Sequence, residues 1–306
     1  MATTPPSRSI AMIGLGSMGL GMARACLAEG HSVSGFDVNP ASVDALTNAG
    51  GRGAKSPADA AKGADIAVIV VVNAAQTETV LFGADGLAET LSPGSVVISC
   101  ATMAPDAARS LGSRCAAKGL LYLDAPMSGG AVRAGTGELT FMASGTPEAF
   151  AAARPALDAM AGKVYELGDE VGVGASFKIV NQLLAGVHIA AACEAITFAS
   201  KLGLDIAKVY EVITASAGNS WMFENRVPHI LDGDYSPRSA VNIFTKDLGI
   251  VSDIGRAETF PLPIAASALQ LFLMTAAAGM GKDDDASPAR MIAQMTGLTL
   301  PGNDGV

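Results

Sequence analysis

A lysine and two side-chain amides lie close together near the start of a long apolar segment. Lys178, Asn181 and Gln182 belong to the segment 173–202, which contains no proline. Residues three and four apart share one face of an α-helix, so we expect these polar groups on a single face. Burying a lysine on an apolar helix is costly unless it has a partner or a task. We therefore interpret this face as the wall of a substrate pocket, with a cofactor-binding part before it in the chain.

A glycine-rich turn follows the first apolar strand. Its sequence is Gly14-Leu15-Gly16-Ser17-Met18-Gly19, with strands predicted over 9–13 and 32–36 and a helix over 20–29. Strand, GxGxxG turn, helix and strand form the full context of a dinucleotide site. The first glycine permits the tight turn, the second lets the backbone approach a pyrophosphate, and the third allows close packing. The helix N-terminus offers N–H groups to phosphates. We expect all six residues of the turn to contact the cofactor.

Asp37 ends the second strand, near the position about 20 residues after the turn where an acidic residue binds the adenosine ribose. Its carboxylate would accept bonds from the ribose hydroxyls and repel a 2′-phosphate. That repulsion is on the order of 4 kcal/mol for charges about 4 Å apart at an effective dielectric constant of about 20. The next residues, 38–40, supply no arginine to offset it. We expect NAD rather than NADP. The alternative role of Asp37 is the N-cap of the following helix.

Two further strand ends offer groups to a cofactor. The run 65–72 is apolar and β-branched, which is typical of a central parallel strand covered on both faces. Val72 and Asn73 lie at its carboxyl end, where ligands bind in open α/β sheets, so we expect both to contact the cofactor. Thr102 follows the strand predicted over 95–99 and has a hydroxyl for the nicotinamide or the substrate. The alternative role of Thr102 is a helix N-cap.

Ser128-Gly129-Gly130 follows a strand predicted over 120–123, which Pro126 stops. Consecutive N–H groups and a hydroxyl would make a site of the size of a carboxylate, whereas the alternative is an ordinary turn. The glycine- and acid-rich residues 168–174 mark the predicted domain boundary. The remaining elements expected before that boundary are a helix over 40–49, a strand within 137–145, a helix over 148–160 and a strand over 163–167.

The rest of the chain has a helical pattern. Helices are clearest over 206–215, 240–257 and 264–278. The stretch 218–226, with the only tryptophan, Trp221, interrupts them, and we interpret it as a loop that is either packed or a lid over the pocket. Lys246 and Asp247 lie in an apolar helix, either as an exposed charged step or with Lys246 reaching the cofactor. Residues 282–285 (KDDD) are typical of a solvated charged turn.

The composition limits the class of protein. The chain has 306 residues, 50% of them hydrophobic, which is enough for two domains with separate cores. A formal net charge of −9 without a Lys/Arg cluster argues against a nucleic-acid partner. The four cysteines form no CxxC pair, so we expect neither a metal site nor disulfides, and a reducing cytoplasm fits. The N-terminal residues lack the apolar region of a signal peptide.

These patterns predict an α/β protein with two domains. Residues 1–170 would form an NAD-binding Rossmann domain with a doubly wound sheet, and 171–306 an all-α domain for substrate binding and oligomerisation, joined by the long helix. That helix is long enough for a membrane span, but its polar residues favour a buried core helix and no membrane partner. Its far end would need cover from a second subunit, so we expect a homo-oligomer, either a dimer or a tetramer.

Four motifs resemble those of the β-hydroxyacid dehydrogenase family, which includes 3-hydroxyisobutyrate dehydrogenase, over nearly the whole chain. They are GLGSMG at 14–19, DAPMSGG at 124–130, GxGxxxKxxNQ at 172–182 and KDLG at 246–249. The resemblance implies that Lys178 is the catalytic acid/base, with Asn181 beside it. It also implies that Ser128, Gly129 and Gly130 bind the substrate carboxylate. The residues it assigns to the cofactor are those of the glycine turn, Asp37, Thr102 and Lys246.

Within the family, three segments are most similar to the subgroup that oxidises L-threonate: 71–76, 218–226 with Trp221, and 239–249. The resemblance implies oxidation at C2 and adds Trp221 to the substrate site. Two positions differ from the pattern. Ala101 stands where the family often has serine, and Asn242 where the subgroup usually has aspartate. Tartronate semialdehyde, a 3-hydroxyisobutyrate-type acid or an imine are alternative substrates, and a non-catalytic dinucleotide-binding module is the alternative to an enzyme.

Overall fold

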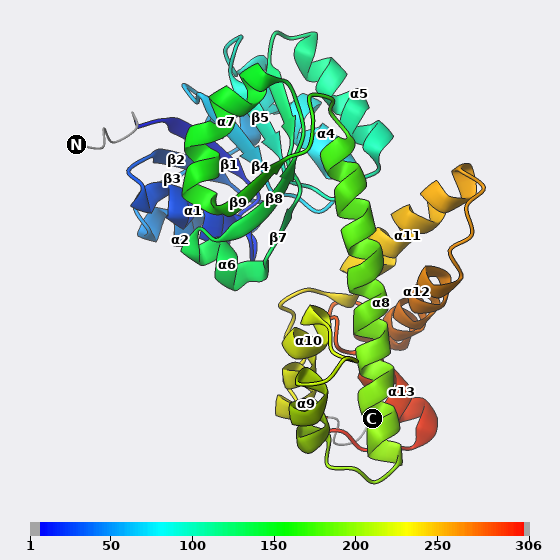
Figure 1. Ribbon diagram of the computed structural model, residues 1–306. Coiled ribbons are helices and arrows are strands. Elements are labelled where there is room, and N and C mark those ends of the chain that lie inside the picture. The colour runs from blue at the N-terminus through cyan, green and yellow to red at the C-terminus, as the bar shows by residue number, and fades with distance from the viewer. Residues whose placement is uncertain (1–6, 303–306) are drawn as a thin grey trace. The chain divides into compact units, whose positions relative to one another are not determined.

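The computed structural model describes residues 7–302 and divides the chain into two compact units, which meet between Lys178 and Ile179. The first contains two β-sheets with their helices, and the second is built from helices (Figure 1). The Rossmann-like sheet and the helical C-terminal region that the sequence predicts are both confirmed. The functional boundary predicted at residue 170 stays a prediction.

Six parallel strands form the main sheet of the first unit, in the order β3-β2-β1-β4-β5-β6. They are β1 (Ser9–Ile13), β2 (Ser32–Phe36), β3 (Arg52–Gly53), β4 (Ile66–Ile69), β5 (Val96–Ser99) and β6 (Leu121–Asp124). This is the strand order of a Rossmann sheet. The chain adds β2 and β3 on one side of β1 and then β4, β5 and β6 on the other side, so the order of addition reverses between β1 and β4. Ligands bind at the carboxyl ends of the strands beside that reversal, where the glycine turn lies.

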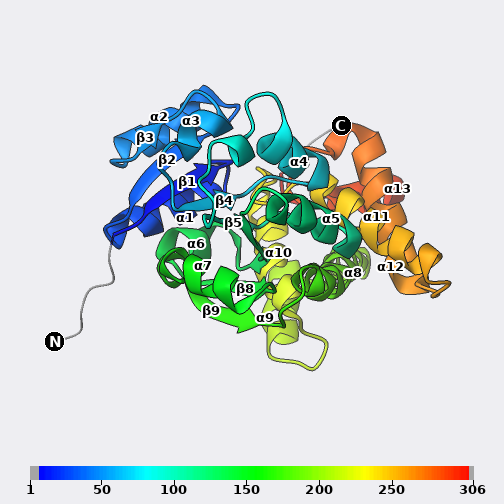
Figure 2. The same cartoon turned by 90° about the horizontal axis from the view of Figure 1, so that it is seen from above.

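Helices cover both faces of this sheet (Figure 2). They are α1 (Gly19–Ala28), α2 (Pro40–Asn48), α3 (Pro57–Ala61), α4 (Ala74–Phe82), the 3₁₀ turn η1 (Leu87–Glu89), α5 (Pro105–Ala116), α6 (Gly130–Thr136) and α7 (Pro147–Met160). Ile10 and Met12 of β1 pack with α1, α6 and α7, whereas Ala11 and Ile13 pack with α3, α4 and α5. Strands covered on both faces are apolar at every position, which explains the continuous apolar run around β4.

A smaller sheet continues from the end of β6. Its strands are β7 (Met127–Ser128), β8 (Leu139–Ala143) and β9 (Ala161–Glu166), in that order. β7 is antiparallel to β8, with Ser128 opposite Thr140. Gly129 and Gly130 follow with φ of +140° and +75°, a region that favours glycine, and lead into α6. Ser128 therefore lies in a paired strand rather than in an ordinary turn.

The long helix predicted over 173–202 is confirmed as α8 (Val173–Lys201). The other helices of the second unit are α9 (Ile206–Thr214), α10 (Trp221–Asp232), α11 (Val241–Ala257), α12 (Pro263–Thr275), the π-helical segment η2 (Ala276–Met280) and α13 (Pro288–Thr296). The inner face of α8 packs in the core of this unit, together with Phe244 of α11 and Phe272 of α12. A Cβ added at Gly186 would lie 2.9 Å from the Leu248 side chain, so glycine lets α8 and α11 approach closely.

Two helical stretches, α8 and the run Pro263–Met280, are long and apolar enough to span a membrane by length and composition. In α8, 50% of the most apolar window is buried inside the protein, as is common in the core helix of a soluble protein. The opposite face of α8 is also apolar. Phe177, Val180, Leu184 and Phe198 are 48–62% exposed, and we call these four residues the outer stripe of α8.

The loop predicted over 218–226 is wrong from Trp221 onward, because Trp221–Asp232 form helix α10, whereas 218–220 lie outside any helix. Ser220 is its N-cap, and the Ser220 hydroxyl accepts a 3.0 Å hydrogen bond from the Phe223 N–H. A serine that caps the third residue after it is an ordinary helix start signal. Gly218 and Asn219, which suggested a loop, lie just before this cap.

The predicted solvated turn at 282–285 is also wrong for its last two residues. The side chains of Asp284 and Asp285 are completely buried. Asp285 pairs with Arg226, whose Nε lies 2.5 Å from Oδ1, and Asp284 lies 2.8 Å from Nδ1 of His229. Both partners belong to α10, far away in the sequence, so local composition did not indicate this burial.

Candidate active site and cofactor site

The glycine turn has the geometry that its sequence predicts. Gly14 has a φ of +90°, and a Cβ there would lie 2.2 Å from the carbonyl oxygen of Val70. A Cβ at Gly19 would lie 1.9 Å from the carbonyl oxygen of Gly14, so α1 packs closely on the turn. A Cβ at Gly16, in contrast, would meet no protein atom within 4 Å. The backbone at Gly16 is therefore open, which leaves room for a ligand to approach it.

Asp37 holds the glycine turn from the end of β2. Its Oδ2 accepts a 2.6 Å hydrogen bond from the Leu15 N–H, and its Oδ1 accepts a 2.8 Å bond from the Asn39 N–H. The N-cap of α2 is Asn39, whose side chain accepts from Ala41 N–H, so the alternative capping role of Asp37 is wrong. Each carboxylate oxygen has a second lone pair. The ribose contact predicted for Asp37 is compatible with this arrangement.

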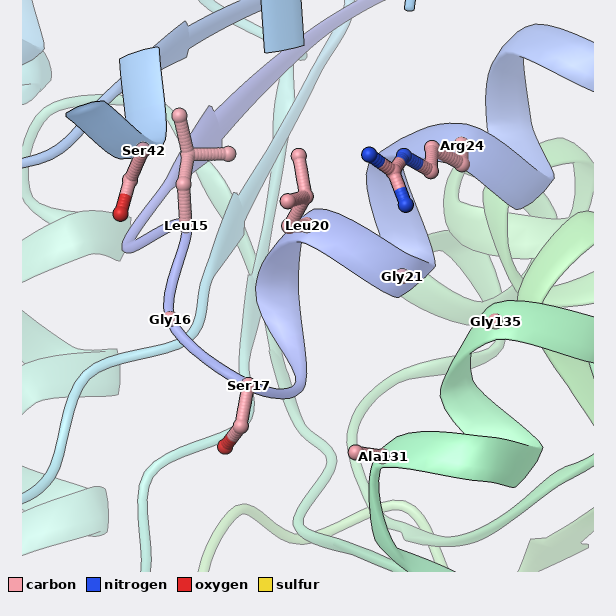
Figure 3. A pocket seen from close by; sticks show the side chains of 9 residues that line it. All are labelled: Leu15, Gly16, Ser17, Leu20, Gly21, Arg24, Ser42, Ala131 and Gly135. Atoms are coloured by element: carbon pink, nitrogen blue, oxygen red, sulfur yellow. The ribbon is translucent and has the colours of Figure 1, made fainter. Parts of the chain in front are cut away.

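A cavity of about 450 Å³ lies beside the turn (Figure 3). It is lined by Leu15, Gly16, Ser17, Leu20, Gly21, Arg24, Ser42, Ala131 and Gly135. α1 starts here, and Met18 at its N-cap position makes no side-chain capping bond. An open backbone at Gly16, an uncapped helix start and the carboxylate of Asp37 fit the pyrophosphate and ribose of a dinucleotide. The residues of the turn would hold such a cofactor.

The predicted cofactor contacts at Val72 and Asn73 lie after β4. Asn73 is the N-cap of α4, and its Oδ1 accepts a 2.9 Å bond from the Gln76 N–H. The Gln76 side chain accepts a 2.8 Å bond from the Val72 N–H in return. This capping role of Asn73 was missed, although the N-x-x-Q spacing indicates it. Cofactor contacts at both residues stay predictions.

Thr102 lies between β5 and α5, as the sequence predicts. The N-cap of α5 is Ala104, which makes no side-chain capping bond, so the alternative capping role of Thr102 is wrong. Ala101 beside it is buried, at 2% exposure. The position where the family often has a serine thus faces the protein interior. The contact of Thr102 with the nicotinamide or the substrate stays a prediction.

Lys178 is brought to the segment that follows β6. Its side chain is largely buried, since the residue is 8% exposed, and its Nζ donates a 2.8 Å hydrogen bond to the carbonyl oxygen of Met127. Met127 precedes Ser128 and Gly129 directly. Two predicted site elements, the helix lysine and the SGG segment, therefore meet in the first unit, although they lie about fifty residues apart in the sequence.

The other polar residues of α8 join a buried network in the second unit. Asn181 Nδ2 donates to Gln182 Oε1 at 2.9 Å, and Gln182 Nε2 donates to Asp247 Oδ2 at 2.5 Å. Lys246 Nζ lies 2.7 Å from Asp247 Oδ1. Asp247 is 1% exposed, so the interpretation of Lys246 and Asp247 as an exposed charged step is wrong for Asp247. The network links Asn181 to Lys246, both of which the sequence singled out.

Gln182 was expected on the polar face of α8 but was given no role of its own, and Asp247 and Asp124 were not assigned to the site. Gln182 shares the helix face of Lys178, and Asp247 stands beside Lys246 in an apolar helix, so both had a signal in the sequence. Asp124 opens the DAPMSGG motif, but only the end of that motif was assigned a role. Trp221, expected in the substrate site, is the first residue of α10 and is 48% exposed. Its substrate contact stays a prediction.

Comparisons with known proteins agree along the chain. Residues 9–168 match the family described as the NAD binding domain of 6-phosphogluconate dehydrogenase. Residues 172–292 match the family described as the NAD-binding domain of NADP-dependent 3-hydroxyisobutyrate dehydrogenase. L-threonate dehydrogenase of Cupriavidus necator is 52% identical over 97% of this chain and 99% of its own length. The enzyme of the same name from Escherichia coli K12 is 47% identical over 96% of each chain.

A solved structure shows the same fold. The crystal structure of a protein described as 3-hydroxyisobutyrate dehydrogenase from Salmonella typhimurium is 48% identical, with a TM-score of 0.89. The match covers 92% of this chain and 99% of that one. The family matches and these relatives together span both units. The chain therefore belongs to the β-hydroxyacid dehydrogenase family and is a 3-hydroxyisobutyrate dehydrogenase-like enzyme that oxidises a hydroxyacid with a nicotinamide cofactor.

Proposed function

We propose that this enzyme oxidises L-threonate at C2 to the 2-keto acid, with NAD as the hydride acceptor. One observation carries the choice of substrate: the relatives that are 47–52% identical over 96–97% of this chain are named L-threonate dehydrogenase. A 3-hydroxyisobutyrate dehydrogenase of Pseudomonas aeruginosa is 36% identical over 88% of the chain. Similarity thus favours the longer, more hydroxylated acid.

Lys178 accepts the proton of the substrate hydroxyl in this proposal. General acid–base catalysis needs a titratable group within hydrogen-bond reach of the reacting oxygen. The contact between Nζ of Lys178 and the Met127 carbonyl supports the assignment, because it directs the amine to the segment expected to hold the substrate. When bound, the nicotinamide accepts the hydride. Asn181 stabilises the developing alkoxide by donating a hydrogen bond, and its link to Gln182 orients its amide.

The substrate carboxylate binds at Ser128, Gly129 and Gly130. Support comes from the backbone, since both glycines have positive φ and a Cβ at Gly130 would meet no protein atom within 4 Å. Successive N–H groups in such conformations form concave anion sites. Trp221 stays the residue proposed to contact the substrate, and Lys246 the residue proposed to contact the cofactor. Residues 1–170 and 171–306 then act as the cofactor and substrate domains.

Asp37 selects NAD. Its carboxylate stands at the end of β2 and is held by Leu15 and Asn39, so it has little freedom to move away from a 2′-phosphate. The description of the second matching family as NADP-dependent favours NADP instead. A test of both cofactors decides between them.

The enzyme assembles through the outer stripe of α8 in this proposal. Four large apolar side chains, Phe177, Val180, Leu184 and Phe198, lie exposed along one helix. A second copy of the chain would remove this surface from water, and its stripe is the same apolar surface. We propose a homo-oligomer, dimer or tetramer, in the bacterial cytoplasm, where its four free cysteines stay reduced.

A 3-hydroxyisobutyrate-type acid is the second candidate substrate. It is favoured by the description of the Salmonella typhimurium structure, which is 48% identical to this chain. Tartronate semialdehyde reduction belongs to the same class of chemistry. A non-catalytic dinucleotide-binding module is the remaining alternative. The buried Lys178 and the separate hydrogen-bond network of Asn181 and Gln182 speak against it.

The test is NADH formation at alkaline pH with C3 to C5 hydroxyacids, each with NAD and with NADP. We expect turnover of L-threonate with NAD and little with glycerate or 3-hydroxyisobutyrate. Turnover of 3-hydroxyisobutyrate alone would replace the substrate and keep the enzyme class. Preference for NADP would contradict the role of Asp37. If no acid is turned over while NADH still binds, the non-catalytic module becomes the better hypothesis.

A further inference from the structure

Asp124 is a buried carboxyl group at the carboxyl end of β6. The residue is 1% exposed, and its Oδ2 accepts hydrogen bonds from Ala175 N–H at 2.8 Å and from Gly172 N–H at 3.1 Å. Ala175 lies in the first turn of α8, and Gly172 directly precedes the helix. The first N–H groups of a helix lack partners within the helix and carry partial positive charge. Asp124 therefore binds the N-terminal end of α8 through one oxygen atom.

Two glycines allow this close approach. A Cβ at Gly174 would lie 2.4 Å from the carbonyl oxygen of Met142 and 2.8 Å from that of Asp124. Gly172 has a φ of +99°, and a Cβ there would lie 2.8 Å from Nη1 of Arg109. The Gly174 N–H donates to Ser144 Oγ at 2.9 Å, which adds a neutral contact to the same helix end. The start of α8 is thus seated on the ends of β6 and β8.

Lys178 follows this seat by one turn of helix. Its Nζ reaches the carbonyl oxygen of Met127, three residues after Asp124. The short segment from Asp124 to Met127 thus contacts α8 at both ends, through the carboxylate at one end and the carbonyl oxygen at the other. A shift of the helix start would move Lys178 relative to Ser128 and Gly129, because a helix moves as a stiff rod over one turn.

Among the titratable side chains next to it, Asp124 is the one whose pKa lies near neutral pH. Burial raises its pKa to about 6, against the hydrogen bonds from Ala175, Gly172 and Ser144 and the charge of Arg109. Burial also raises the pKa values of Cys100 and Tyr122, which feel the Asp124 charge, so both stay neutral. Arg109 belongs to α5.

We propose that Asp124 is a positioning residue for catalysis: its carboxylate seats the first turn of α8 and so places the Lys178 amine over the Met127–Gly129 backbone. This inference rests on the proposed role of Lys178 as the base. It predicts that the ionised form of Asp124 supports turnover and that its neutral form does so less well. The carboxylate contributes nothing directly to the substrate in this proposal.

The test compares Asp124→Asn with the wild type. Asparagine keeps an oxygen that accepts from Gly172 and Ala175 but has no charge, so we expect kcat to fall about tenfold at pH 8 while the KM for NAD changes less than about twofold. The kcat of the wild type should fall as the pH drops through about 6, and this step should be missing in the variant. The variant should melt no lower than the wild type at pH 8, because a buried charge is removed.

Matched variants separate positioning from damage to the fold. Ser144→Ala removes the contact with Gly174 and also the Ser144 hydrogen bond that lowers the pKa of Asp124, so the pH step should remain but move to higher pH. Asp158→Asn loses an exposed charge on α7 and should change neither kcat nor its pH dependence. An unchanged kcat in Asp124→Asn overturns the proposal, and so does a pH step that persists in it. A loss of kcat with a large drop in melting temperature would also overturn it, since damage to the fold would then explain the effect.

A measurement without substrate separates this inference from the proposed function. Hydrogen–deuterium exchange of the peptide covering 168–178, at one fixed pH above 7, should be faster in Asp124→Ala than in Asp124→Asn or the wild type. Faster exchange with full activity of Asp124→Ala would keep the seat of α8 but contradict its link to catalysis. If Lys178→Ala is fully active, the proposed base is wrong, and the exchange result still reports on the helix start alone.

Discussion

Nζ of Lys178 lies 2.8 Å from the carbonyl oxygen of Met127, which is the residue before the SGG segment. A main-chain oxygen thus accepts a hydrogen bond from the amine. The base and the substrate-carboxylate site proposed here therefore share one anchor in the first unit. This relationship makes the catalytic assignment testable apart from cofactor binding, since the glycine turn lies on other strands.

Lys178→Ala should lower kcat by roughly 10²–10⁴-fold, the usual effect of removing a general acid or base. The affinity for NADH should stay within about twofold of the wild type, as titration of NADH fluorescence would show. Lys201→Ala changes an exposed lysine at the other end of the same helix and serves as the control. Near-normal turnover of the Lys178 variant would contradict the assignment of the base.

Gly16→Ala and Gly14→Ala should separate ligand binding from folding. An added methyl at Gly16 meets no protein atom within 4 Å, so the variant should keep its melting temperature and bind NAD at least tenfold more weakly. Gly14 has a φ of +90° and lies close to Val70, so the same change there should lower the melting temperature markedly. If Gly16→Ala and the wild type bind NAD with equal affinity, the cofactor does not bind at this turn.

Asp37→Asn should narrow the preference for NAD over NADP. The amide oxygen keeps the bond from the Leu15 N–H, while the negative charge that repels a 2′-phosphate is lost. We expect the ratio of kcat/KM for NAD to that for NADP to fall by about tenfold or more, which equals roughly 1.4 kcal/mol. A ratio equal to that of the wild type would show that another residue selects the cofactor. Asp44→Asn on α2 is the control for a change of charge alone.

The pH dependence of stability should report on Asp124. Its pKa is raised from 3.8 to about 6 in the folded protein, so the stability that its neutral form contributes is complete below pH 4 and is lost as the pH rises through 6. The shift corresponds to about 3 kcal/mol of unfolding free energy. Denaturant unfolding of Asp124→Asn at pH 4 and pH 7.5 should lack this decrease. A parallel pH dependence in both proteins would contradict the shift.

The buried pair of Arg226 and Asp285 should matter far more than an exposed pair. Arg226→Met leaves the Asp285 carboxylate, whose pKa burial raises despite the Arg226 charge, without its cation. We expect a loss of about 3–5 kcal/mol of unfolding free energy. The control Lys208→Met breaks an exposed pair with Glu211 and should cost less than about 1 kcal/mol. Similar losses in both variants would mean that burial of Asp285 does not govern its energy.

The amino-acid sequence by itself determined the Rossmann part and the long helix. The signals were local: the period of apolar residues, the glycine turn after β1, and a run of residues without proline that became α8. β1 and β2 match their predicted bounds, because apolar strands covered on both faces leave little room for another interpretation. The motifs were contiguous as well, so the family was visible before the fold.

Only the tertiary structure decided which polar groups are buried and with whom. Asp284 and Asp285 looked solvated because their partners lie on α10, far away in the sequence. Asp247 looked exposed because Gln182 belongs to a different helix. Asp124 had no predicted role, because its hydrogen bond with the Ala175 N–H at the start of α8 joins residues far apart in the sequence. A charge is buried only where a partner from another element compensates for the lost water, and no local pattern of residues carries that information.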